Sequence, residues 1–98
     1  MSIKKGKSLQ EKLKNLRTEI DSADKILIEV LYHRFKAVKK VGKLKKKLGL
    51  PLVQKERWEE VVIDRVKRAN KIKLNELFVR AMLRIIHQES VRIQRGKK

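Results

Sequence analysis

Cysteine is absent from this sequence, and histidine occurs only as His33 and His87. A disulfide framework and a cysteine-based metal site are therefore excluded, and two scattered histidines do not make a zinc cluster. No apolar run approaches the length that spans a bilayer, and the start MSIKKGKSLQ lacks the apolar stretch of a secretory signal. We therefore expect a cytoplasmic protein with no metal site and no membrane-spanning segment.

Acidic residues are also scarce, since 11 Asp and Glu stand against 28 Lys and Arg and give a formal net charge of +17. Such an excess favours an anionic partner, which can be nucleic acid, a membrane surface or a small polyanionic ligand. Charge alone does not choose among the three. The length of 98 residues allows one small domain.

Leucine, isoleucine and valine recur at steps of three or four rather than in alternation. This periodicity predicts an all-α chain without strands. Three helices are expected, over about residues 8–48, 54–70 and 75–94. Gly49 and Pro51 end the first helix. Asn75 is a good N-cap for the third, with Leu74 and Val79 placed to form a hydrophobic staple.

The first predicted helix is too long for a chain of this size. It would extend over roughly 60 Å, whereas a compact monomer of about 100 residues has a radius of gyration near ~13 Å. Its apolar stripe would be exposed, and a second copy of the chain is the simplest way to cover it. We therefore predict a homodimer.

Each shorter helix has one side that we expect to face the core. For the second helix these residues are Trp58, Val61, Val62, Arg65, Val66 and Ala69. For the third helix they are Leu77, Phe78, Ala81, Met82, Ile85, Ile86 and Glu89.

Two cations interrupt the apolar stripe of the first helix. Arg34 and Lys45 lie about 20° apart on the helical wheel, in line with apolar neighbours. Charges that face a core are costly unless paired, and two cations cannot pair with each other, so an anionic ligand between them is one explanation. Side chains that snorkel or form ion pairs are the other. Arg17 lies about 25 Å away along the helix and could reach such a site only from a second, antiparallel chain.

The other two helices carry further candidates. Ser90 and Gln94 share one face of the third helix, and Arg57 lies in the first turn of the second, where backbone N–H groups favour anions. No nucleophile–base pair, carboxylate–histidine pair or metal set accompanies them. Such a site would bind and orient a small polyanion without a covalent or acid–base step. Trp58 is expected to pack rather than to stack on a ligand, and the run KKVGKLKKKLG is most simply a solvated face.

Taken together, the segments resemble a known family. They are LRTEID..D..L...L..R at 16–34, VGKLK at 41–45, GLPL at 49–52, ERWEE at 56–60 and ES...Q at 89–94. This pattern resembles the all-helical, type II chorismate mutases over about residues 9–95. No single motif is specific, but the ordered set of Arg, Arg, Lys, Arg, Ser and Gln is.

The resemblance implies an intertwined homodimer of three-helix chains that rearranges chorismate to prephenate without a cofactor. Arg34 and Arg57 would bind carboxylates, with Arg17 arriving from the other subunit. Lys45 and Gln94 would hydrogen-bond the ether oxygen, and Ser90 would support a carboxylate. We expect a basic extension at 1–7, the mutase domain at 8–95 and a tail at 96–98.

One departure concerns the substrate's ring hydroxyl. Many relatives have Asp at the position of Gln54 and Glu at that of Trp58. Gln54 could still contact the hydroxyl, whereas Trp58 can only donate. The forms Q..RWEEV and IH.ES look closer to mutase domains attached to 3-deoxy-7-phosphoheptulonate synthases, which makes such a synthase a candidate partner.

Three alternative functions compete with that of a mutase. An isochorismate–pyruvate lyase shares the fold and also lacks the Glu at the Trp58 position, although Ser90 matches the mutases better. A basic helical nucleic-acid binder fits the net charge, and the Lys36–Lys47 run could track phosphates. The sequence argues against it, because it has no DNA- or RNA-binding motif and few aromatic residues for stacking. A purely structural coiled-coil partner would leave Arg34 and Lys45 unexplained.

Overall fold

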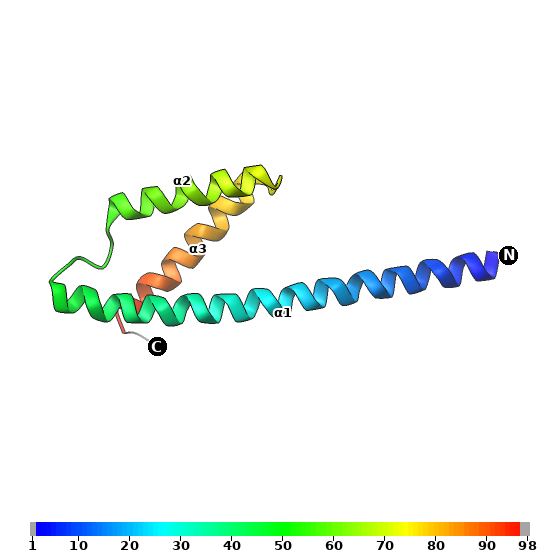
Figure 1. Cartoon of the computed structure of the whole chain (residues 1–98), viewed down its shortest axis with the longest axis horizontal. Coiled ribbons are helices and arrows are strands. Elements are labelled where there is room, and N and C mark those ends of the chain that lie inside the picture. The colour runs from blue at the N-terminus through cyan, green and yellow to red at the C-terminus, as the bar shows by residue number, and fades with distance from the viewer. Residues whose placement is uncertain (1, 97–98) are drawn as a thin grey trace. The chain divides into compact units, whose positions relative to one another are not determined.

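The computed structural model describes the backbone of residues 2–96 and the side chains of residues 8–96. Three helices make up this part of the chain, in the order α1 (Ser2–Leu48), α2 (Lys55–Lys71) and α3 (Glu76–Gln94), and residues 2–96 contain no strand (Figure 1). The all-α fold with a very long first helix is confirmed. No helix in this described part is long and apolar enough to cross a membrane.

The start of α1 differs from the expected one. The helix begins at Ser2 rather than near residue 8, because nothing in residues 2–7 except Gly6 disfavours helical backbone. The side chains of the expected basic extension at 1–7, Met1 as a whole and residues 97–98 of the expected tail lie outside the described residues. The domain boundaries at 8 and 95 stay predictions.

The chain divides into two compact units, residues 1–34 and residues 35–98. The first contains only the N-terminal part of α1 and buries no side chain of its own among residues 8–34. Its apolar stripe is largely bare, with Leu9 at 59% and Leu27 at 51% exposure. The sequence predicted this exposed apolar face. The second copy of the chain that would cover it stays a prediction.

The second unit begins with the C-terminal end of α1, which stops as expected. Gly49 has a φ of 69°, in the left-handed region that glycine reaches without strain. The N–H of Leu50 donates to the carbonyl of Lys45 at 2.8 Å, and that of Gly49 donates to Lys46 at 3.3 Å. These two bonds make a Schellman motif, which satisfies the last carbonyls of α1 and turns the chain towards Pro51.

The core of the second unit lies between α2 and α3. Val66 and Ala69 of α2 are buried against Val79 and Leu83 of α3, and Trp58 packs with them. The predicted inner side of α2 is therefore confirmed. In Figure 1 the two helices meet at the turn that joins them.

The turn between α2 and α3 has both of its ends capped. Lys73 takes a φ of 62°, and the N–H of Leu74 donates to the Ala69 carbonyl at 3.0 Å, which again closes a Schellman-type turn. The predicted N-cap of α3 is confirmed, because the Asn75 side chain accepts from the N–H of Phe78 at 2.9 Å.

The predicted core side of α3 is wrong in part. Leu77 and Ile85 are 78% and 66% exposed, and Phe78 is also exposed, whereas the buried residues of α3 are Val79, Leu83 and Ser90. The reason is that α3 is apolar on more than one side, and periodicity does not say which of these sides faces α2. The remaining apolar side is bare within the single chain.

Candidate active site

Lys45 and Gln94 meet where the end of α1 lies against the end of α3. The Lys45 ammonium donates to Gln94 Oε1 at 2.7 Å and to the carbonyl of Leu52 at 2.7 Å. Burial at this point lowers the pKa of Lys45, because a desolvated ammonium is less stable than one in water. The side chain is thus held by two neutral oxygens rather than by a carboxylate.

This arrangement leaves hydrogen-bond donors for a ligand. An ammonium has three N–H groups, and two of those of Lys45 are used by its partners within the described residues. Because Lys45 occupies the Oε1 of Gln94, the amide N–H groups of Gln94 remain as donors. Lys45 and Gln94 can therefore both donate to one oxygen atom of a bound molecule.

Gly42 makes the close approach of α1 and α3 possible, and our sequence reasoning missed its role. A Cβ at this position would lie 3.0 Å from Cγ and 3.1 Å from Cα of Gln94. These distances are shorter than ordinary contacts between carbon atoms, which are about 3.5–4.0 Å. The available signal was a glycine inside a helical pattern three residues before Lys45, since such a glycine often marks close packing.

Ser90 lies one turn before Gln94 on α3, as the sequence predicted. It is only 6% exposed, and its hydroxyl donates to the carbonyl of Ile86 at 2.8 Å. A hydroxyl is both a donor and an acceptor, and its O–H can rotate towards another acceptor. Ser90 is thus the buried polar group next to the Lys45–Gln94 pair along α3.

Gln54 and Arg57 lie at the N-terminus of α2. Gln54 is the N-cap residue, with extended backbone and no capping bond from its side chain. The Arg57 side chain is 61% exposed and lies 3.8 Å from Glu60, a surface pair worth at most about 1 kcal/mol. Among the described residues, no hydrogen bond or ion pair joins Gln54 or Arg57 to the Lys45–Gln94 pair. Their convergence on one ligand stays a prediction.

Arg17 and Arg34 belong to the first unit, residues 1–34. Arg17 is exposed, and Arg34 is partly buried on the same helix, α1. Their positions in a shared site likewise stay predictions.

Trp58 packs on His87, which joins the start of α2 to α3. The two rings stack with centroids 4.1 Å apart and planes inclined by 26°. The expectation that Trp58 packs rather than stacks on a ligand agrees with this contact. His87 is the partner that sequence reasoning missed, because nothing in the sequence marked a histidine three residues before Ser90 as a ring partner.

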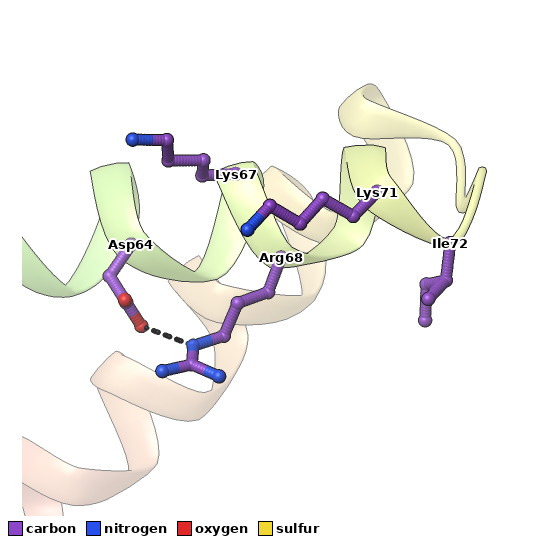
Figure 2. Close-up of a pocket in the computed structure, with 5 residues that line it drawn as sticks. All are labelled: Asp64, Lys67, Arg68, Lys71 and Ile72. Carbon is purple, nitrogen blue, oxygen red and sulfur yellow. Dashed lines mark hydrogen bonds and ion pairs between the residues drawn. The ribbon is translucent and has the colours of Figure 1, made fainter.

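A depression of about 550 Å³ lies along the outer side of α2 and its C-terminal end, but it contains none of the predicted site residues. It is lined by Asp64, Lys67, Arg68, Lys71 and Ile72 (Figure 2). Arg68 donates to Asp64 at 3.0 Å, and hydrogen bonds from Arg65 and Arg68 hold the pKa of Asp64 below its usual range. The cations are thus partly neutralised by an acid. Among the described residues, no group of histidines and carboxylates could hold a metal ion.

Comparison with known proteins finds one family and several relatives that match most of this chain. The family described as chorismate mutase type II matches residues 16–95. The T-protein of Haemophilus influenzae is 37% identical over 83 residues, and that of Enterobacter agglomerans is 33% identical over 82 residues. These alignments cover 85% and 84% of this chain and 22% of each T-protein.

A third relative is the bifunctional chorismate mutase/prephenate dehydratase of Aquifex aeolicus. It is 35% identical over 81 residues, which are 83% of this chain and 22% of that protein. The chain therefore spans about a fifth of the length of these curated relatives. No solved structure matches the chain significantly.

Proposed function

The chain belongs to the type II chorismate mutase family, and on that premise we propose that it rearranges chorismate to prephenate in the branch of aromatic amino-acid biosynthesis that leads to phenylalanine and tyrosine. The observation that carries the proposal is the contact between Lys45 and Gln94 at 2.7 Å. In this reaction one C–O bond breaks and one C–C bond forms within a single molecule. It needs no nucleophile and no cofactor, which agrees with the absence of a nucleophile–base pair from the predicted site residues.

Lys45 and Gln94 are proposed to stabilise the ether oxygen of chorismate. That oxygen gains negative charge as its bond to the ring breaks, so donors fixed beside it favour the transition state over the ground state. A preorganised donor of this kind is typically worth about 10²–10³ in kcat. The bond of Lys45 to Leu52 and the packing of Gln94 on Gly42 supply the preorganisation.

The remaining predicted residues are proposed to bind the substrate. Arg34 and Arg57 suit carboxylates, because a guanidinium pairs with a carboxylate through two parallel hydrogen bonds. The weak pair of Arg57 with Glu60 could be exchanged for a ligand carboxylate at small cost. Ser90 would turn its hydroxyl from Ile86 to a carboxylate, and Gln54 would contact the ring hydroxyl.

Two variants test the assignment of the ether-oxygen donors. Lys45→Ala and Gln94→Ala should each lower kcat for chorismate by about 10²–10³, with a smaller effect on KM. Lys43→Ala is the matched control, because Lys43 is an exposed lysine of the same helix and should keep full activity. Equal losses in Lys43→Ala and Lys45→Ala would argue against a specific role for Lys45.

The active form is proposed to be an intertwined homodimer in which Arg17 enters the site of the partner subunit. The bare leucines of residues 8–34 and the exposed apolar side of α3 support this proposal. Burying one such side chain stabilises the assembly by roughly 1.5–3 kcal/mol. Exposed surface of this extent is otherwise unusual for a monomer.

Subunit mixing tests the contribution of Arg17. Arg17→Ala and Arg34→Ala chains are each expected to be inactive, whereas heterodimers contain one site with both arginines. Random exchange should therefore restore about a quarter of the wild-type activity. Mixing Arg17→Ala with the double variant Arg17→Ala/Arg34→Ala is the control and should restore none. If exchange is demonstrated and no activity returns, Arg17 does not act across the interface.

Trp58 favours a second candidate reaction, the cleavage of isochorismate to salicylate and pyruvate by a lyase of the same fold. The ring stacks on His87 and supplies no carboxylate at the position where many mutases have Glu. Supplying isochorismate and assaying pyruvate separates the two reactions. The mutase proposal expects turnover of chorismate and none of isochorismate.

We further propose that the chain works together with a 3-deoxy-7-phosphoheptulonate synthase. It rests on the forms Q..RWEEV and IH.ES, which contain the stacked pair Trp58 and His87. The three relatives described above are two T-proteins and a prephenate dehydratase fusion, so they support the family and not this branch. Co-purification with a synthase from the same organism is the test, and a chain that elutes alone would contradict the partnership.

A further inference from the structure

The end of α1 carries six lysines that the proposed reaction does not use. They all lie within residues 35–48, and every one of them is exposed; we call them the lysine stripe. They are Lys36, Lys39, Lys40, Lys43, Lys46 and Lys47. Within the described residues none of the six has an ion pair or a hydrogen bond, and no Asp or Glu occurs in the sequence between Glu29 and Glu56.

The geometry of the helix gathers these lysines on one side. At 100° per residue they fall within an arc of about 120°, and they extend over about 16 Å along the axis. Lys45 lies about 160° from the middle of this arc, on the side that contacts Gln94. The lysine stripe is therefore separate from the candidate active site, and it faces away from the Lys45–Gln94 contact.

The spacing of charge on the lysine stripe matches a phosphate backbone. Each strand of a nucleic-acid duplex presents one phosphate per about 3.4 Å of axis, so 16 Å carries about five phosphates on one strand. Six flexible ammonium groups over the same length can neutralise about that number. Lysine acts as a point charge, and the stripe has no arginine or aromatic residue that would read a base edge.

Other anionic partners fit the lysine stripe less well. Protein interfaces are depleted in lysine and enriched in arginine and aromatic residues, which this face lacks. Helices that bind in a membrane interface insert apolar side chains, and no apolar residue lies within the arc of the stripe. We propose that the lysine stripe is a docking surface for the phosphate backbone of duplex nucleic acid, used without sequence preference. The proposal does not depend on the chorismate reaction.

The proposal predicts how strongly the affinity for a duplex depends on salt concentration. Neutralising about five to six phosphates predicts that log K falls with log salt with a slope of about −5. Between roughly 50 and 200 mM salt, the affinity for a duplex should therefore fall by about 10³-fold. Two duplexes of unrelated sequence should give equal affinities, because only the backbone is contacted.

Two triple variants of the 98-residue chain distinguish the lysine stripe from net charge, and each lowers the net charge by the same amount. The stripe variant carries Lys36→Gln, Lys40→Gln and Lys43→Gln. The control variant carries Lys12→Gln, Lys25→Gln and Lys67→Gln, at exposed positions outside the stripe. The helix content of both is checked by circular dichroism, and a charge-preserving variant with Arg at the three stripe positions should bind like the wild type.

Fluorescence anisotropy with labelled DNA duplexes of about 24 base pairs is the measurement. The stripe variant should have a slope of about −3 and the control a slope of about −5. Equal slopes in the two variants would assign binding to net charge and overturn the proposal. Tighter binding to polyglutamate or to phosphatidylglycerol vesicles than to either duplex, at equal salt, would also overturn it.

Discussion

Replacement of Gly42 by alanine tests whether the close approach of α1 and α3 positions the amide of Gln94. The added Cβ would lie 3.0 Å from Cγ and 3.1 Å from Cα of Gln94. Because ordinary contacts are about 3.5–4.0 Å, the end of α3 must move by roughly 0.5 Å, since a side-chain rotation alone does not relieve the contact with Cα.

The effects of this substitution on stability oppose each other. Alanine in place of glycine inside a helix favours the folded state by about 1 kcal/mol, whereas overpacking typically costs about 1–3 kcal/mol. The free energy of unfolding should therefore fall by no more than about 2 kcal/mol. A displacement of about 1 Å at a reacting group can cost about 10²-fold in rate, so a shift of about half that size predicts a loss of roughly tenfold in kcat.

The assay is the turnover of chorismate by Gly42→Ala, together with urea unfolding of the same preparation. Lys43→Ala, at the next and exposed position, is the control for a general effect of alanine on this helix. Wild-type kcat in Gly42→Ala would refute the reasoning, because the Lys45–Gln94 pair would then tolerate the shift. Loss of kcat together with loss of the folded state would make Gly42 a structural residue only.

Four further predictions concern three neighbouring residues. Gln94 does not titrate, so kcat should be constant from about pH 6 to 8. Because burial lowers the pKa of Lys45, kcat should fall at an alkaline pH that is lower than the usual pKa of a lysine. A steep fall of kcat within pH 6–8 would contradict this prediction. Between the lowered pKa of Lys45 in the folded chain and its ordinary pKa in the unfolded chain, the free energy of unfolding should rise with pH. In this pH range the unfolded chain still binds a proton that the folded chain has lost. Ser90→Ala should raise KM, because the hydroxyl that is proposed to support a substrate carboxylate is lost, while the bond to the Ile86 carbonyl accounts for about 0.5–1.5 kcal/mol of the free energy of unfolding; an unchanged KM would remove Ser90 from the site. Trp58→Ala should lower the free energy of unfolding by about 3 kcal/mol through loss of its packing on the α2–α3 core together with the stack on His87, and a change below about 0.5 kcal/mol would show that neither contributes much.

Local chemistry made the helix ends predictable. Gly49 and Asn75 lie where a left-handed C′ residue and an N-cap are needed, and these requirements involve only a few neighbouring residues. The inner side of α2 could also be predicted, because its apolar residues other than Ile63, which is 68% exposed, form a single stripe. The buried side of α3 was not, since Leu77 and Ile85 give that helix a second apolar side.

Contacts between residues far apart in the sequence could not be predicted from the hydrophobic periodicity. The sequence marked Lys45 as a cation within an apolar stripe and Gln94 as a candidate site residue, but their direct hydrogen bond joins positions 49 residues apart. The stack of Trp58 on His87 and the role of Gly42 likewise depend on how α1, α2 and α3 pack within residues 35–98. Such contacts depend on how two helices fit together, and the residue pattern of one helix alone does not predict them.

The most direct test of the account is to incubate the purified chain with chorismate, follow its disappearance by ultraviolet absorbance and identify the product. We predict prephenate formed well above the uncatalysed rate, with kcat lowered by about 10²–10³ in Gln94→Ala. Turnover no faster than the uncatalysed reaction, in a chain that is folded by circular dichroism, would contradict the proposed reaction.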